Sequence, residues 1–400
     1  MGGGILQLSA YGSQDIFLTG NPQITFFKSV YHRHTNYSVE SMEYSFDGDR
    51  DARKFGTRLT VTIPKNGDLI YRSYLQIKLN DPSNNWKPYV GHVMIENISL
   101  YIGRELIDKH SGEWLNTWGE LSTPQSKWRT YQGMIGYPQT DNSSAMILYI
   151  PLQFWFCRRL GSALPICALQ NQDIRIVLEL RGKSDVMSAS ENGLINYIKL
   201  YVDNIYLDTK EKKRFLDNDH EYLIEQVQYN GEDPIVSSTS KECELIFNHP
   251  IKEIIWTTKQ ASNELFDYNE ERTLNEVSLK INGIPRFPVR PGRYFSFVQP
   301  YQHHTRVPAG EPTEELDANV PNRDEPSTGN SYNKQIHVYS FAEKPEELQP
   351  SGTLNMSMTD KVTLKLTYDS AVTNSIIKIF AVNYNVLRIM SGMAGLAFSN

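Results

Sequence analysis

The segment Ile98-Ser99-Leu100-Tyr101-Ile102 recurs 179 residues later as Val277-Ser278-Leu279-Lys280-Ile281. Apolar residues at every second position are typical of a β-strand that buries one face. A single match of this kind carries little information, because alternating strands resemble one another. This pair decides the fold because other segments around it recur in the same order and at nearly the same spacing.

Three further pairs of segments lie at offsets of 180, 179 and 184 residues: Gly112-Glu113-Trp114 with Gly292-Arg293-Tyr294, Ile198–Tyr201 and Asn204 with Ile377–Phe380 and Asn383, and Leu59, Val61 and Ile63 with Cys243, Leu245 and Phe247. Matches in sequence order at a nearly constant offset indicate an internal repeat. We therefore expect the two halves of the chain to be two copies of one β fold.

The composition favours sheets and loops over helix bundles, with 23 Tyr and 16 Phe beside 25 Gly and 20 Pro in 400 residues. Roughly eight alternating segments can be found in each half, the number that a jelly roll requires. We expect an all-β chain of two tandem eight-stranded antiparallel jelly rolls, a double jelly roll, with long inter-strand loops.

Two helices are predicted. Asp208-Thr209-Lys210-Glu211 has the form of a capping box and predicts a short linker helix near the midpoint of the chain. After Ser111, an apolar stripe at helical spacing predicts a second helix that packs on the first barrel. The resulting division is an N-terminal arm at 1–27, a first jelly roll at 28–210, a linker at 211–226 and a second jelly roll at 227–400.

Charge and cysteine content exclude several classes of protein. The 40 basic and 46 acidic side chains leave a net charge of −6, which disfavours a free-standing nucleic-acid-binding protein. Three cysteines at no ligand spacing are expected to be reduced thiols. The longest uncharged stretch, Asn142–Cys157, is too short and too polar for the ~20 apolar residues of a membrane-spanning helix.

Two polar segments, Thr123–Ser144 and Pro308–Lys334, fit no strand pattern and are predicted to be long loops. The second has six acidic and two basic side chains, so we expect it to project outward into solvent. Within the first, Asn142 is the one Asn-X-Ser/Thr asparagine expected to be exposed, which makes it a candidate glycosylation site, although an unmodified asparagine is the preferred interpretation.

Familiar catalytic patterns are absent from the sequence. It contains neither a phosphate-binding Gly-x-x-x-x-Gly-Lys-Ser/Thr loop nor a Gly-x-Ser-x-Gly nucleophile elbow. His32 with His34, and His303 with His304, lack the further ligands of a metal site and are expected to be loop or surface histidines. Glu346-Glu347 is expected to be ion-paired or solvated and not a glycosidase acid pair. We therefore predict a non-enzyme with no catalytic residues, no metal and no cofactor.

Several blocks spread over the chain are too particular for a generic β fold: Gln7–Lys28, Asp108-Lys109-His110, Glu221–Gln226, Phe247-Asn248-His249-Pro250, Val298–His304, Tyr339–Ala342, Gln349–Thr353 and Asn383–Met393. In this order they closely resemble the major capsid proteins of nucleocytoplasmic large DNA viruses. One departure is Leu354-Asn355-Met356-Ser357-Met358, where that family has a Cys-Asn-Phe-Ser-Arg type of run.

This resemblance implies a structural protein with two upright jelly rolls, which trimerises into pseudo-hexagonal capsomers of an icosahedral shell. Implied partners are the chain itself, in homotrimers and neighbouring trimers, and minor capsid proteins, with an internal membrane at the capsomer base as a further candidate; direct nucleic-acid binding is not expected. The implied location is the virion, assembled in the host cytoplasm. Two alternatives stay open, a minor capsid paralogue of the same fold and a tandem jelly-roll protein that binds or processes carbohydrate.

Overall fold

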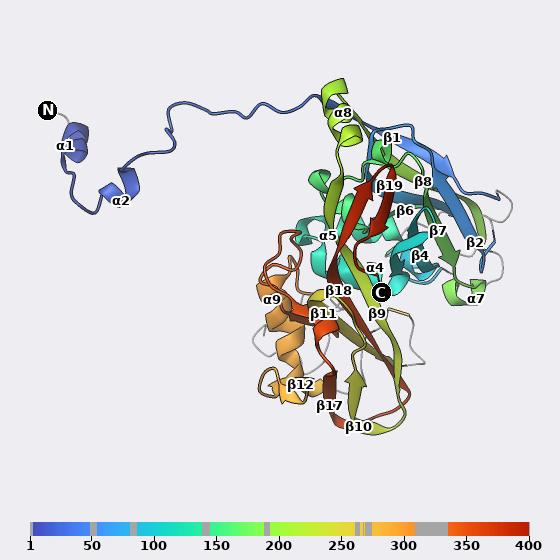
Figure 1. The fold of residues 1–400 in the computed structure, drawn as a ribbon. Helices are drawn as coiled ribbons and strands as arrows, with labels where there is room; N and C mark the ends of the chain where they lie inside the picture. The colour runs from blue at the N-terminus through green and yellow to red at the C-terminus, as the bar shows by residue number, and fades with distance from the viewer. Residues whose placement is uncertain are drawn as a thin grey trace, which may run out of the picture. The chain divides into compact units, whose positions relative to one another are not determined.

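A computed structural model describes residues 3–48, 54–80, 86–137, 145–187, 193–260, 265–266, 268, 274–308 and 335–399. The chain divides into two units, Met1–Asn36 and Tyr37–Asn400. Unit 1 contains two short helices, α1 (Gly3–Ser9) and α2 (Ile16–Thr19), and neither helix has a buried residue. Unit 2 contains all the strands (Figure 1).

The first half of unit 2 is an eight-stranded jelly roll. Its strands are β1 (Tyr37–Ser45), β2 (Arg58–Ile63), β3 (Leu69–Asn80), β4 (Ile95–Ile102), β5 (Glu105–Ser111), β6 (Ala145–Pro151), β7 (Ile174–Leu180) and β8 (Leu194–Leu207). They form two antiparallel sheets in the orders β1-β8-β3-β6 and β2-β7-β4-β5. Each sheet alternates early with late strands, which is the jelly-roll connection.

The second half repeats this order. Its strands are β9 (His220–Ile235), β10 (Ser238–Glu244), β11 (Pro250–Gln260), β12 (Leu274–Ile281), β13 (Ile284–Pro285), β14 (Arg290–Pro291), β15 (Ile336–Ser340), β16 (Leu354–Asn355), β17 (Val362–Val372), β18 (Ser375–Met390) and β19 (Met393–Leu396). Pairing runs β9-β18-β11-β15 in one sheet and β10-β17-β12-β13 in the other. The predicted all-β double jelly roll is confirmed, and the repeated Ile98–Ile102 and Val277–Ile281 lie in the equivalent strands β4 and β12.

The repeated glycines explain part of this equivalence. A Cβ atom on Gly112 would lie 2.5 Å from the carbonyl oxygen of Ile95, and one on Gly292 would lie 2.2 Å from that of Leu274. Ile95 and Leu274 are the first residues of β4 and β12. Because only glycine permits such a close backbone approach, both halves place the segment that follows the strands in the same way.

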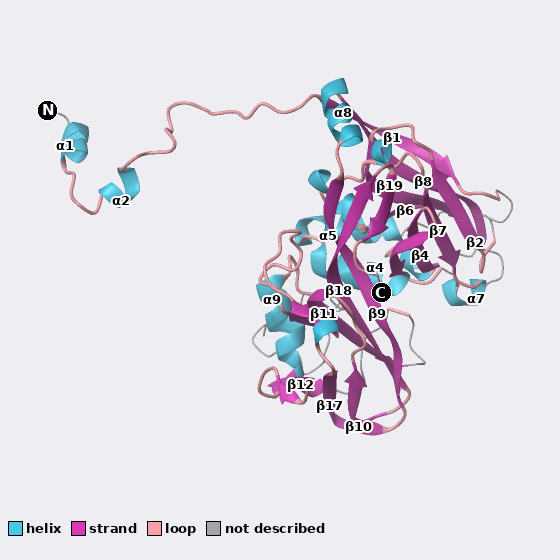
Figure 2. Cartoon of the chain, in the orientation of Figure 1, coloured by secondary structure: helices cyan, strands magenta, loops and turns pink. Residues whose placement is uncertain are grey.

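Helices fill the connections between strands (Figure 2). They are α3 (Val90–Val93), α4 (Gly112–Ser122), α5 (Gln125–Ile135), α6 (Trp155–Arg158), α7 (Lys183–Val186), α8 (Thr209–Asp217) and α9 (Gln299–His303), with 3₁₀ turns at Leu160–Ser162, Ile166–Ala168 and Met356–Met358 and a π-helical turn, η4, at Tyr294–Val298. Both predicted helices are present: the Ser111 side chain caps α4 by accepting the Trp114 N–H (3.1 Å), and Asp208 precedes α8.

Two details differ from the sequence-based expectation. Within Thr123–Ser144, predicted to be a loop, residues Gln125–Ile135 form α5, because Trp128, Tyr131 and Ile135 make a buried stripe on one face of it. Strand β9 begins at His220, so β-structure resumes directly after α8. The three cysteines are free thiols as expected, with Cys157 and Cys243 buried.

Candidate functional site: the seam between the jelly rolls

The two jelly rolls share one hydrophobic core. In β18, Ile377, Ile379 and Ala381 point into the second barrel and belong to its internal core. The alternate residues Phe380 and Val382 point outward and belong to the core of the first barrel. Strand β18 therefore has two buried faces. We call the contact between its outward face and α4 the seam.

Aromatic rings fill the seam. Phe380 packs on Trp114 of α4 with ring centroids 5.6 Å apart, and Tyr229 of β9 stacks on the other side of Phe380 at 5.0 Å. Trp114 also stacks on Trp118. Large rings that contact one another from different elements leave little freedom for the two barrels to slide or rotate.

Charges bridge the seam beside these rings. Lys378 of β18 donates to both carboxylate oxygens of Glu113 in α4, at 2.7 and 2.8 Å, and lies 2.9 Å from Glu232. The bond from Lys378 lowers the pKa of Glu232. Lys378 and Glu113 are largely buried, so the pair is shielded from water and fixes the register between the barrels.

A second buried group of charges links α6 to the second barrel. Glu225 of β9 accepts from Arg158 at 2.5 Å and from Lys252 at 2.6 Å. The Lys252 side chain is fully buried, and this burial, only partly offset by Glu225, lowers its pKa. One carboxylate thus holds two cations away from water.

Glu225→Gln should destabilise the chain by about 3–5 kcal/mol, because it leaves two cations buried without a counter-charge. Glu221→Gln, on the same strand, is the matched control: Glu221 accepts from Arg388 at 2.8 Å with both side chains exposed, so its loss should cost less than about 1 kcal/mol. Urea unfolding of both variants measures the two values. Equal losses would contradict the assignment.

The connection that leads to the acidic Pro308–Lys334 segment is anchored to the first barrel. Arg306 donates to Glu120 at 2.6 Å, lies 3.6 Å from the ring centroid of Trp128, and donates its backbone N–H to the Leu121 carbonyl. Residues 309–334 themselves lie outside the described part of the chain, as does the candidate glycosylation site Asn142. The starting point of the acidic segment is therefore fixed on α4 and α5.

The histidine expectation is wrong for His304. Its side chain is fully buried between Glu253, at 2.9 Å, and Glu346, at 3.0 Å. Burial alone lowers the pKa of His304, but the two carboxylates outweigh it and raise this pKa to about 9. Its neighbour His303 contacts the Glu343 carbonyl and is exposed, as expected. Among the described residues, no three His, Cys, Asp or Glu side chains cluster as metal ligands would.

Stability should peak near pH 6.5. His304 is protonated in the folded chain and its pKa lies above the usual 6.5, so its contribution is complete below pH 6.5 and is lost as pH rises toward 9. Burial lowers the pKa of His92 and of His337 to about 3, so protonation of the unfolded chain removes stability as pH falls below 6.5. His304→Gln should flatten the alkaline side in thermal unfolding between pH 5 and 9. Unchanged slopes in this variant would contradict the account.

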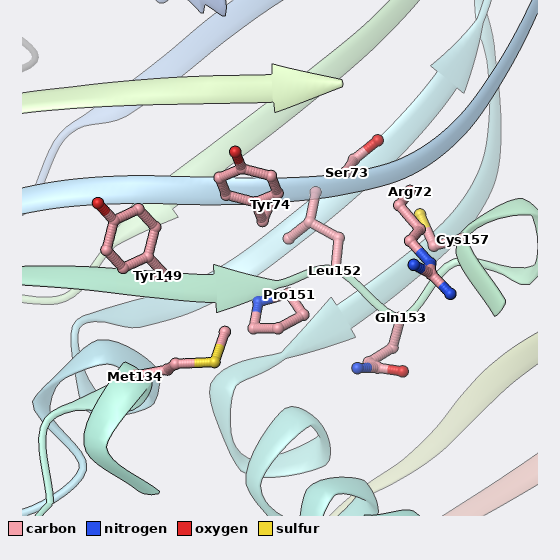
Figure 3. A pocket seen from close by; sticks show the side chains of 9 residues that line it. All are labelled: Arg72, Ser73, Tyr74, Met134, Tyr149, Pro151, Leu152, Gln153 and Cys157. Carbon is pink, nitrogen blue, oxygen red and sulfur yellow. The ribbon is translucent and has the colours of Figure 1, made fainter. Parts of the chain in front are cut away.

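The outer face of the sheet β1-β8-β3-β6 carries tyrosines. Tyr74 stacks on Tyr201 at 5.1 Å with nearly parallel rings, and Tyr149 lies 6.1 Å from Tyr74. A hollow of about 390 Å³ opens beside them, lined by Tyr74, Tyr149, Met134 of α5 and six neighbours (Figure 3). Its lining is mostly apolar, which suits contact with a protein surface more than binding of a charged ligand. In the described residues, no helix is long and apolar enough to cross a membrane.

Comparison with known proteins assigns these features. The model of the major capsid protein N-terminus matches residues 25–208, and that of the large eukaryotic DNA virus major capsid protein matches residues 211–313 and 327–395. The chain is 47% identical to the major capsid protein of Pyramimonas orientalis virus and 34% identical to that of Paramecium bursaria Chlorella virus 1, with each pair covered completely.

Solved structures agree. A quasi-atomic model of the PBCV-1 virus capsid contains a chain that matches 94% of this one and is itself covered completely, with a TM-score of 0.78 and 29% identity. The Faustovirus major capsid protein matches 95% of this chain, and 94% of its own length is covered, with a TM-score of 0.72. At 11% identity the second likeness concerns the fold alone.

Proposed function

The chain belongs to the family of major capsid proteins of large eukaryotic DNA viruses, and we propose that three copies of it associate into a capsomer with a pseudo-hexagonal outline. A major capsid protein is a structural component of the virion shell, which is built from many copies of one chain. The observation that carries the proposal is the repeated strand order in two barrels joined by one core.

Symmetry gives the physical reason. Three chains around a three-fold axis present six similar barrels, so one protein can meet six neighbours in a lattice. This outline requires a fixed angle between the two barrels of each chain. The buried Lys378–Glu113 pair and the Trp114–Phe380 contact supply that rigidity.

Three finer assignments belong to the same proposal. The division into 1–27, 28–210, 211–226 and 227–400 describes an arm, a barrel, a linker and a second barrel. The arm contacts minor capsid proteins or an internal membrane at the base of the capsomer. Assembly takes place in the host cytoplasm, and the chain acts without catalytic residues, metal or cofactor.

The oligomeric state tests the proposal. Purified full-length chain should scatter light with a mass of three times 45.9 kDa, independent of concentration over a wide range because the contact surfaces of a closed ring are all occupied. A stable monomer or dimer at micromolar concentration would overturn it.

The arm has its own test. Unit 1 has two short helices that bury nothing, so removing Met1–Asn21 should leave the melting temperature and the trimer mass unchanged. Shell assembly, followed by electron microscopy of particles formed on co-expression with the other capsid components, should fall severalfold. Normal particle yield from the truncated chain would sink the assignment of this arm.

A further inference from the structure

The internal repeat relates the seam to a second surface of the chain. The α4 face in the seam comprises Glu113, Trp114, Thr117, Trp118 and Leu121, all of them buried. Each contacts the second barrel or the connection that follows it: Glu113 binds Lys378, Trp114 packs on Phe380, Thr117 lies 3.4 Å from the Tyr268 hydroxyl, Trp118 meets His304, and the Leu121 carbonyl accepts from Arg306.

The same positions in the second barrel are uncovered. At the offset of 180 residues given by the paired glycines, this face corresponds to Arg293, Tyr294, Phe297, Val298 and Tyr301, on η4 and α9. Tyr301 is 78% exposed and Val298 38%, while Arg293 is exposed and the other two are half-buried. We call this set the α9 face. It is apolar and aromatic apart from one cation, and it lacks the cover that its counterpart has.

The complementary half of the seam also has an uncovered counterpart. Strand pairing places Phe380 beside Ile255 and Ile255 beside Val338 across the second barrel. All three are almost fully buried in the shared core. The equivalent row in the first barrel is Tyr201, Tyr74 and Pro151, which are paired in the same way and are only half-buried.

The rings of this row are held ready for contact. Tyr201 donates its hydroxyl to Glu43 at 2.7 Å, and the Tyr149 hydroxyl accepts from Gln76 at 3.0 Å. With their polar tips bonded and their rings stacked, the tyrosines can cover apolar surface without ordering many rotamers. We call Glu43, Tyr74, Tyr149, Pro151 and Tyr201 the tyrosine face. The hollow of Figure 3 opens beside its Tyr74 and Tyr149.

We propose that the α9 face of one copy packs on the tyrosine face of the next copy, so that the contact between chains repeats the seam within each chain. This inference rests on the proposed trimer and names its surfaces. The contact joins two different faces, and a head-to-tail contact of this type closes into a ring when its rotation permits. Three chains and three seams then alternate around six barrels.

Charge supports this pairing. In the seam, the sheet supplies the cation Lys378 and the helix supplies the carboxylate Glu113. Between copies the signs are reversed: the α9 face carries Arg293, and the tyrosine face carries Glu43, which lies 2.7 Å from Lys199 at the position equivalent to Lys378. The reversal keeps the faces complementary and disfavours a sheet pairing with the wrong helix.

The opposite sheets offer less suitable faces. The outward residues of β17 in the second barrel are Thr363, Lys365 and Thr367, and on the neighbouring strands Lys280 faces Glu242. Desolvating such charges costs more than desolvating stacked tyrosines. The tyrosine face is therefore the sheet surface best suited to a second copy.

Charged substitutions on the exposed positions test the inference. Tyr301→Glu combined with Val298→Glu should convert the trimer to monomer, raising the concentration for half-association at least 100-fold in light scattering. Ile246→Glu is the matched control, because Ile246 is 81% exposed on the same barrel and outside the α9 face, and this variant should remain trimeric. Circular dichroism melting checks that both variants fold.

Charge exchange gives a second measurement. Arg293→Glu alone should weaken the trimer, and adding Glu43→Arg should restore it at least partly, since only the pairing between copies joins these residues. A wild-type chain that is not trimeric would overturn the proposed function itself. A trimeric wild type whose Tyr301/Val298 variant also stays trimeric, or an Arg293→Glu defect that Glu43→Arg does not relieve, would overturn this inference alone.

Discussion

The structure depends on one constraint, the burial of both faces of β18. Its inward residues close the second barrel, and its outward residues Phe380 and Val382 complete the core of the first. Neither barrel can therefore move relative to the other without exposing the core that they share. The Lys378–Glu113 pair reinforces this geometry, since separating the barrels would leave two charges buried without partners or force them apart into water.

Duplication turns this constraint into a building principle. The two barrels have the same strand order and even the same glycine after the same strands, but they differ in what covers them. Within a chain, α4 covers the outer face of the second barrel's sheet. The corresponding face of the first barrel, with its stacked Tyr74 and Tyr201, is left for a neighbour. A chain with one satisfied and one open contact of the same design polymerises into a ring, and the mild net charge of −6 keeps many copies from repelling one another strongly.

Much of the fold could be predicted from the sequence because its signals are local. Strand alternation and the offset near 180 residues identified a repeated β fold, and caps at Ser111 and Asp208 identified two helices. The seam was missed, although a signal exists: Ile376–Val382 is apolar except for Lys378, whereas the equivalent 197–203 alternates with Lys199 and Asp203. A strand without alternation is buried on both faces. His304 offered no such signal, because its partners Glu253 and Glu346 lie far away along the chain.

A reconstruction of the purified trimer by electron microscopy tests the central claim most directly. The account predicts six barrels at nearly equal angular spacing, with interfaces between chains that superpose on the seam within each chain, α9 lying over Tyr201 as α4 lies over Phe380. A trimer in which the chains meet through other faces, leaving Tyr201 and Tyr301 in solvent, would contradict it.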